Sequence, residues 1–179
     1  MEHMHEPAGR EHAGVATATG ATNARAACAA HFARLLHERG LHAALGYLNE
    51  RTRYRFTGLY RADPPLLRNV GLFDRENPRI DPSGAVTKLN ETYCSITCDT
   101  ARPFFTPDAA HDERLVAHAA RDSVLCYTGV PILRANGQPW GSLCHFDLRP
   151  RLLPRDELGA LSSVAPVVVE WLHSTREER

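Results

Sequence analysis

The segment from Val124 to Asp147 constrains the fold of this chain more than any other. Two runs of β-compatible residues flank Ala135-Asn136-Gly137-Gln138, and Asn-Gly is the strongest two-residue signal for a tight hairpin turn. If Asn136 and Gly137 are the central turn residues, counting outward fixes which residues face each other. The segment therefore predicts an antiparallel strand pair of known register.

This register places apolar or small residues on both faces of the strand pair. The expected pairs are Val130 with Leu143 and Ile132 with Gly141 on one face, and Gly129 with Cys144 and Tyr127 with Phe146 on the other. A strand pair that is apolar on both faces is normally covered twice. We expect helices over one face and a cavity-forming loop region over the other.

Periodicity and turn residues predict the other elements. They are an amphipathic helix or helix pair over 24–49 with a potential break at Gly40, strands over 54–60 and 66–73, a loop over 74–86, a short helix over 88–100, a strand over 104–106, a helix over 112–120, and a terminal helix from Pro154 that Pro166 should kink. The order lacks regular βαβ alternation. It predicts an α+β fold with an antiparallel sheet.

Length and composition indicate one globular domain. The chain has 179 residues, of which 43% are hydrophobic. Residues 1–22 are rich in Ala, Gly, Thr and His and contain no Phe, Trp or Tyr. We predict a disordered tail over 1–22 and a domain over 23–175.

Charge and cysteine content exclude several classes of partner and compartment. The 21 Lys and Arg residues balance 21 Asp and Glu residues without long blocks, so neither nucleic acid nor a membrane surface is expected as a partner. No apolar stretch has the length of a membrane span, and no signal-peptide core is recognisable. Five scattered cysteines indicate reduced thiols rather than a disulfide framework, and we expect a cytoplasmic protein.

Several motifs follow one another along the second half of the chain. They are Tyr127-Thr128-Gly129-Val130-Pro131-Ile132, Asn136-Gly137, Gly141-Ser142-Leu143-Cys144 and Asp147-Leu148-Arg149-Pro150, preceded by Tyr93-Cys94-Ser95, Arg102-Pro103-Phe104 and Pro107-Asp108-Ala109. In this order they resemble motifs of the GAF domains found in many bacterial sensor kinases and cyclases. The likeness covers about residues 24–173. It implies a GAF/PAS-like fold: a central antiparallel sheet of five or six strands, with the first and last helices on one face and a ligand pocket on the other.

The resemblance implies a chamber between the sheet and the short helices of the middle segment. It places these residues near a ligand: Tyr93, Cys94, Ser95, Phe104, Cys126 and Tyr127. Pockets of this kind are apolar and carry a few convergent polar groups. Core packing alone is the competing explanation, because free cysteine behaves as a small buried hydrophobe. The sequence identifies neither a ligand nor a cofactor.

Two groups of residues have metal-ligand chemistry, although structural roles explain them better. Asp108, His111 and Asp112 combine carboxylates with an imidazole, but Asp108 follows a proline in a turn and Asp112 stands where a helix needs a cap. His145 lies among apolar residues on a strand, as a structural histidine does. We predict no metal site.

The predicted function is a non-catalytic small-molecule-sensing or regulatory domain. Because the chain ends a few residues after its last helix, the output is expected to act in trans, through a homodimer or a separate signalling protein. The first alternative is a free methionine-(R)-sulfoxide reductase, a family that looks like stand-alone GAF domains and uses cysteine thiolates. Cys94 lies near one of that family's cysteine positions, but His118 stands where its catalytic cysteine is expected. A cyclic-nucleotide-binding module is the second alternative, although its signature is not recognisable.

Overall fold

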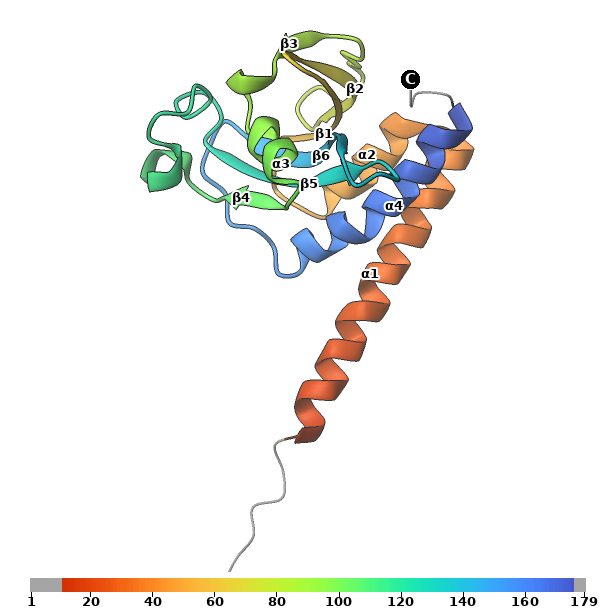
Figure 1. Cartoon of the computed structure of the whole chain (residues 1–179). Helices are drawn as coiled ribbons and strands as arrows, with labels where there is room; N and C mark the ends of the chain where they lie inside the picture. The colour runs from red at the N-terminus through yellow and green to blue at the C-terminus, as the bar shows by residue number, and fades with distance from the viewer. Residues whose placement is uncertain (1–10, 176–179) are drawn as a thin grey trace, which may run out of the picture.

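The computed structural model describes the backbone of residues 11–175 and the side chains from residue 19 onward. Its elements are α1 (Glu11–Arg39), α2 (Leu41–Glu50), β1 (Phe56–Asp63), β2 (Leu66–Asp74), β3 (Val86–Lys88), α3 (Cys94–Thr100), β4 (Phe104–Thr106), β5 (Cys126–Leu133), β6 (Pro139–Asp147) and α4 (Glu157–Thr175), with short 3-10 turns over 89–91, 109–111 and 113–115. Figure 1 shows their arrangement.

The strands form a six-stranded sheet in the order β3-β2-β1-β6-β5-β4, in which all neighbours are antiparallel. Helices α1, α2 and α4 lie on one side of the sheet, and α3 with the loops around it lies on the other (Figure 1). This confirms the predicted fold class and the placement of the terminal helices.

The hairpin between β5 and β6 turns one residue earlier than predicted. The Gly137 amide donates to the Arg134 carbonyl over 2.8 Å, and the Arg134 amide donates to the Gln138 carbonyl over 2.8 Å. The central turn residues are therefore Ala135 and Asn136, and Gly137 follows them with φ +79°. A positive φ at this position is accessible to glycine without steric cost, which explains why the turn closes here.

The predicted register is nevertheless confirmed, because a second irregularity compensates for the turn. Ile132 pairs with Gly141 but Leu133 pairs with Pro139, which leaves Trp140 as an extra residue on β6. A bulge of this kind shifts the register by one residue. All four predicted pairs from Tyr127 to Ile132 are formed.

The first helix is longer than predicted. It ends before Gly40, as expected, but begins at Glu11, so that residues 11–22 of the segment expected to be a disordered tail are part of the helix. No proline interrupts residues 11–39, and the Ala-rich composition favours helix even where the helix extends past the sheet (Figure 1). Residues 1–10 of the predicted tail lie outside the described residues.

The helix predicted over 112–120 is not formed. Only residues 113–115 make a 3-10 turn. The His118 amide donates to the carbonyl three residues back, and the His118 ring accepts the Ala120 amide over 3.1 Å. Leu115 and Ala120 are both buried while Val116 is exposed, so tertiary packing holds the segment as an irregular chain despite its helix-forming residues.

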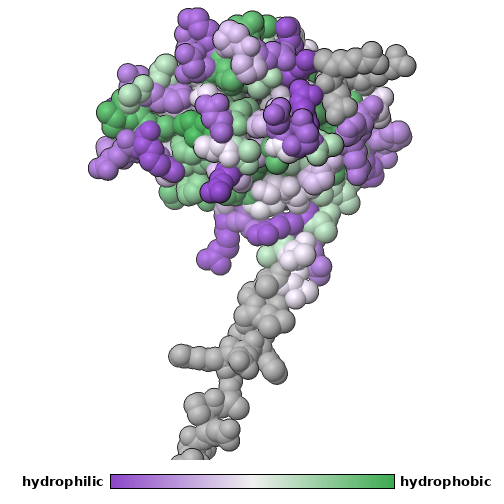
Figure 2. Space-filling model, in the orientation of Figure 1, coloured by the Kyte–Doolittle hydropathy of each residue, from purple (hydrophilic) through white to green (hydrophobic). Residues whose placement is uncertain are grey.

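Each face of the sheet has its own apolar core. The core under the helices includes Phe32, Leu45, Leu143 and Val164, and the core on the opposite face includes Tyr93, Phe104 and Tyr127. On the surface, Figure 2 shows hydrophilic residues spread among smaller hydrophobic patches. Within residues 11–175 no helix combines the length and apolar character that crossing a membrane requires.

Candidate functional site

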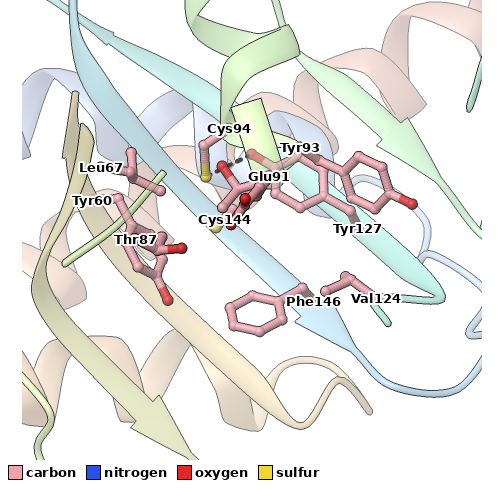
Figure 3. Close-up of a pocket in the computed structure, with 11 residues that line it drawn as sticks. Tyr60, Leu67, Thr87, Glu91, Tyr93, Cys94, Val124, Tyr127, Cys144 and Phe146 are labelled. Atoms are coloured by element: carbon pink, nitrogen blue, oxygen red, sulfur yellow. Dashed lines mark hydrogen bonds between the residues drawn. The ribbon is translucent and has the colours of Figure 1, made fainter. Parts of the chain in front are cut away.

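A cavity of about 120 Å³ lies on the face of the sheet opposite the terminal helices (Figure 3). It is bounded by β1, β2, β5 and β6 below and by the segment leading into α3 above. Its lining is mostly apolar and consists of Tyr60, Leu67, Thr87, Glu91, Thr92, Tyr93, Cys94, Val124, Tyr127, Cys144 and Phe146. An apolar chamber with a few polar groups is the usual form of a small-molecule site.

Two glycines shape the floor of this cavity. Cys144 on β6 pairs with Gly58 on β1 and with Gly129 on β5. A Cβ atom on Gly58 would lie 2.5 Å from the ring of Tyr60, and one on Gly129 would overlap the hydroxyl of Tyr127. The missing side chains therefore let both tyrosine rings lie against the sheet on either side of Cys144.

The hydroxyl of Tyr127 reaches Cys94 at the start of α3. It donates to the Cys94 Sγ over 3.6 Å, and the Thr97 hydroxyl lies 3.2 Å from the same oxygen. Burial raises the pKa of Tyr127 and of Tyr60, so both phenols stay protonated, and Tyr127 donates to Cys94.

The two thiols of the cavity have different protonation behaviour. A hydrogen bond from the Cys144 thiol, together with weaker ones from Tyr127 and other hydroxyls, outweighs burial and lowers the pKa of Cys94 to about 7. Burial raises the pKa of Cys144 well above its ordinary value. The site therefore pairs a readily ionised thiol with one that remains protonated.

The structure brings three of the six predicted ligand-binding residues to the cavity: Tyr93, Cys94 and Tyr127. Phe104 lies behind them, with ring centroids 6.2 Å from Tyr93 and 6.1 Å from Tyr127. Ser95 turns away from the cavity, because its hydroxyl donates to the Thr92 carbonyl and lies 3.4 Å from His118 Nε2.

Cys126, which we also expected near the ligand, does not line this pocket. Successive residues of a strand point to opposite faces, so Cys126 and Tyr127 cannot both face the cavity. Cys126 lies near Tyr54 and Asp147, and the hydroxyl of Tyr54 lies 3.4 Å from the Thr128 hydroxyl on the helix-covered side. Burial raises the pKa of Cys126 to about 12.

Sequence reasoning missed eight lining residues: Tyr60, Leu67, Thr87, Glu91, Thr92, Val124, Cys144 and Phe146. For Cys144 and Phe146 a signal existed, because the predicted register already placed both on the face of Tyr127. For Tyr60 and Leu67 no local signal existed, since their position depends on the pairing of β1 with β6.

The acidic and histidine residues considered as metal ligands have structural roles. Asp108 accepts the Ala110 amide and Asp112 accepts the Arg114 amide, each over 3.1 Å, so both cap short turns. His111 Nδ1 lies 2.8 Å from Asp108. In the part of the chain that the structure describes, no group of three or more His, Cys, Asp or Glu side chains has the arrangement of a metal site.

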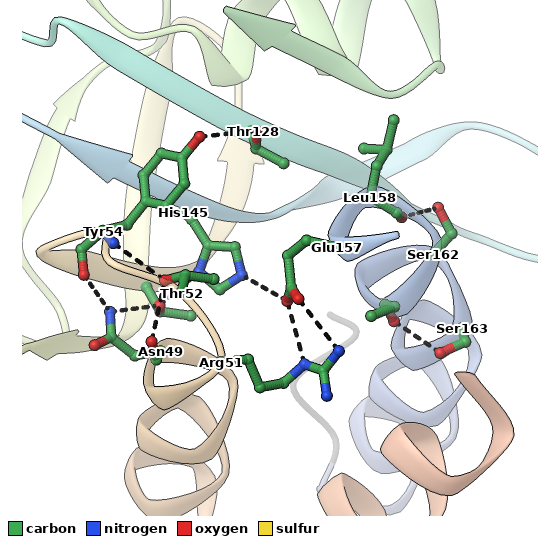
Figure 4. Close-up of polar contacts among 12 residues, drawn as sticks. Asn49, Arg51, Thr52, Tyr54, Thr128, His145, Glu157, Leu158, Ser162 and Ser163 are labelled. Atoms are coloured by element: carbon green, nitrogen blue, oxygen red, sulfur yellow. Dashed lines mark hydrogen bonds and ion pairs between the residues drawn. The ribbon is translucent and has the colours of Figure 1, made fainter. Parts of the chain in front are cut away.

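His145 belongs to a buried polar network on the helix-covered face (Figure 4). Asn49 donates to the Thr57 hydroxyl over 2.9 Å, and that hydroxyl lies 2.7 Å from His145 Nδ1. His145 Nε2 lies 3.4 Å from Glu157, which also pairs with Arg51 at 3.2 Å. Because an ionised carboxylate only accepts hydrogen bonds, Nε2 of His145 donates to Glu157 while Nδ1 pairs with the Thr57 hydroxyl, so both ring nitrogens have a partner. The network ties α2, the sheet and the start of α4 together.

We expect Gly129→Ala to disturb the cavity specifically. The new methyl group would push the Tyr127 hydroxyl away from Cys94 and cost about 1–3 kcal/mol through overpacking. Titration of the Cys94 thiol, followed by its rate of alkylation at several pH values, should then show a higher pKa than in the unmodified protein. An unchanged pKa would mean that Tyr127 does not stabilise the thiolate. Gly20→Ala on exposed α1 has open space around the new methyl group and serves as the control.

Comparison with known protein families gives a match over most of the chain. A family model described as "GAF domain" matches residues 21–169. No match is found among curated protein sequences.

Solved structures with the same architecture include the GAF domain of a phosphotransferase and two methionine-R-sulfoxide reductases. The GAF domain of an Acinetobacter phosphoenolpyruvate-protein phosphotransferase has a TM-score of 0.64 at 11% identity, covering 86% of this chain and 97% of that one. A free methionine-R-sulfoxide reductase from Neisseria meningitidis has 0.65 at 12% identity, covering both chains fully. A type II enzyme of the same name from Thermoplasma acidophilum has 0.56 at 20% identity, covering 80% and 94%. At these identities the likeness shows the fold alone.

Proposed function

The chain belongs to the GAF domain family, and from this premise we propose that it is a non-catalytic sensor or regulatory domain that binds a small molecule in the cavity above β6. The observation that carries the proposal is the cavity itself. It combines a mostly apolar lining with a few polar groups on one face of the sheet. Such a chamber favours binding over packing, because a well-packed core leaves few voids larger than a water molecule.

The size and lining of the cavity limit the ligand. A volume of about 120 Å³ holds roughly four water-sized groups. Carbon and ring atoms form most of its wall. Polar atoms come from Thr87 on β3 and from Glu91 and Thr92 in the segment that leads into α3. The ligand that fits best is a compact, largely apolar molecule with one group able to hydrogen bond.

The proposed output passes through the sheet to the terminal helices. The strands that form the cavity floor pack on α2 and α4 with their opposite faces, so a shift of β5 or β6 changes the support of those helices. We propose that the helices pass the signal to a second copy or to a separate signalling protein in the cytoplasm.

A methionine-sulfoxide reductase is the second candidate, and the lowered pKa of Cys94 favours it. The resemblance, however, places His118 where that family's catalytic cysteine is expected. His118 lies 3.4 Å from the Ser95 hydroxyl and 4.7 Å, between ring centroids, from Tyr93. Since an imidazole cannot replace a thiolate in sulfur exchange, the sensor remains the better-supported function.

We expect the protein purified from its own host to retain a small molecule that native mass spectrometry detects. Val124→Trp should abolish that retention, because the indole enlarges a side chain that lines the cavity beside Phe146 (Figure 3). Val116→Trp makes the same substitution at an exposed position and should retain the molecule.

An empty wild-type protein would contradict the small-molecule proposal and favour a scaffold that binds only a protein partner. Turnover of free methionine sulfoxide with a thioredoxin-type reductant, lost in Cys94→Ser, would instead support the reductase.

A further inference from the structure

Two cysteine side chains from distant parts of the sequence meet at the bottom of the cavity. Cys94 begins α3 and Cys144 lies in the middle of β6, and their exposed fractions are 3% and 0%. The two thiols lie close enough for each to shift the pKa of the other. Figure 3 shows both sulfur atoms on the cavity side of their elements. Both cysteines line the same cavity, so their thiols share one small space, and closeness of the two side chains is a precondition for a disulfide.

The surroundings give the two thiols different chemical roles. Cys94 accepts hydrogen bonds from Cys144 and from Tyr127, which stabilise its thiolate. A thiolate is the form of cysteine that attacks an oxidant. Cys144 is held in the protonated form by burial and stands next to the attacking sulfur. This is the arrangement of an attacking cysteine with a resolving cysteine.

The cavity gives this pair a route for a small oxidant. Its volume of about 120 Å³ exceeds the space of a single water several-fold, so a hydroperoxide of two or a few heavy atoms fits in it. Both cysteines line it directly. A larger disulfide reagent would not reach them without movement of α3.

The other three cysteines lack this combination. Cys28 is buried in the core under the helices and Cys126 lies on the same face of the sheet. Cys98 is one turn along α3 from Cys94 but does not line the cavity, and burial raises its pKa to about 12. The structure therefore supplies internal controls for any claim about Cys94 and Cys144.

We propose that Cys94 and Cys144 form a hydroperoxide-sensitive dithiol that converts to a disulfide between α3 and β6. The Cys94 thiolate attacks one peroxide oxygen, the O–O bond breaks, and hydroxide or alkoxide leaves and takes up a proton. The resulting Cys94 sulfenic acid is then attacked by Cys144, which loses its proton as the S–S bond forms and water leaves. Two thiols are oxidised and one peroxide is reduced to water and an alcohol, or to two waters with hydrogen peroxide.

The disulfide would regulate binding of the small molecule in the cavity. This regulatory role rests on the proposed function, whereas formation of the disulfide does not. A covalent bond between α3 and the floor holds the roof of the cavity in place and removes the hydrogen bond that Cys94 accepts from Cys144. Ligand entry in the oxidised form is then blocked. A thiol reductant of the glutathione class restores it, but reaches the buried disulfide only when α3 moves.

The test is to treat the full chain with hydrogen peroxide, unfold it in N-ethylmaleimide so that the remaining thiols are blocked, digest it without reduction and map cross-linked peptides by mass spectrometry. The expected product joins the peptide of Cys94 to that of Cys144. Because no Lys or Arg separates Cys94 from Cys98, the same experiment on Cys98→Ser identifies the partner. Cys98→Ser should cross-link like the wild type, and Cys144→Ala should accumulate Cys94 sulfenic acid that dimedone traps.

The pH dependence of the oxidation rate is a second test, because an exposed thiol with an ordinary pKa would give a different pH profile. With a pKa of about 7, the rate of Cys94 oxidation should rise about tenfold from pH 6 to pH 8 and then level off. A thiol with the ordinary pKa of about 8.5 would rise roughly eightyfold over that range and continue upward.

A cross-link through Cys98, no cross-link at all, or equal oxidation of all five thiols would overturn the inference. Failure of this inference is distinguishable from failure of the proposed function. A protein that retains a small molecule but forms no disulfide loses only the switch, whereas one that forms the disulfide but never binds a small molecule loses only the sensor.

Discussion

Glu157→Ala is expected to lower the free energy of unfolding by about 3–5 kcal/mol, the usual cost of removing one partner from a buried charged network. The carboxylate is 1% exposed, receives Arg51 at 3.2 Å and lies 3.4 Å from His145 Nε2. Without it, the His145 ring keeps a buried donor with no acceptor, and Arg51 loses its partner at the junction of α2 and α4. Urea denaturation followed by circular dichroism measures the loss.

Glu170→Ala is the matched control, because Glu170 is an exposed residue of the same helix. Its replacement should change the stability by less than about 0.5 kcal/mol. A similar loss in both variants would mean that the effect comes from α4 in general and not from the network.

The Glu157 effect should also depend on pH. Burial acts to raise the pKa of this carboxyl group, but hydrogen bonds and charge from His145 and Arg51 together lower it below its ordinary value. A group whose pKa is lowered by folding contributes stability above its unfolded pKa of about 4.3 and loses that contribution as the pH falls through the folded pKa. The difference between wild type and Glu157→Ala should therefore shrink below about pH 4. A difference that stays constant to pH 3 would contradict an ionised Glu157.

Gly141→Ala is the second substitution with a large expected effect. Gly141 pairs with Arg61 on β1 and with Ile132 on β5, so it lies between two central strands. A Cβ at this position would overlap the backbone carbonyl oxygen of Tyr60, which cannot rotate away as a side chain can. We expect a loss of about 3 kcal/mol or more, because β1 and β6 must separate.

Gly20→Ala is the control for Gly141→Ala, and it is expected to raise the free energy of unfolding instead of lowering it. Gly20 lies in α1, and no atom approaches the position of its added methyl group. Alanine in an exposed helix is favoured over glycine by about 0.5–1 kcal/mol, so this variant should be slightly more stable. If Gly141→Ala lowered the free energy of unfolding no more than Gly20→Ala does, β6 would not approach β1 as closely as described.

The sequence predicted the local elements whose signals lie within a few residues of each other. The β5–β6 register was predictable because strand residues alternate with period two, and the Asn-Gly turn allowed only a one-residue error that Trp140 absorbed. The break at Gly40 and the strands β1 and β2 were also predictable, because the residues that signal them lie close together in the sequence. The helix over 112–120 was not, because its backbone donors are taken by contacts such as that of His118 with Ala120.

The candidate site was predictable only in part. Tyr93, Cys94 and Tyr127 lie in or beside the motifs that resemble the family, and the cavity contains all three. Cys126 was misplaced although the alternation that excludes it was already available from the register. The role of Gly58 and Gly129 is visible only in the tertiary structure, where the absence of their side chains leaves room for the rings of Tyr60 and Tyr127.

By itself the sequence determined the α+β class and the central hairpin, because each follows from periodicity or turn chemistry over short distances. The placement of the terminal helices on one face of the sheet was an expectation from the family resemblance. The tertiary structure alone decided which side chains meet. Pairing of β1 with β6 brings Tyr60 to the cavity across more than eighty residues, and the packing of α3 on β6 brings Cys94 to Cys144. Local propensity carries no information about such contacts, since they depend on which faces of distant elements are buried together.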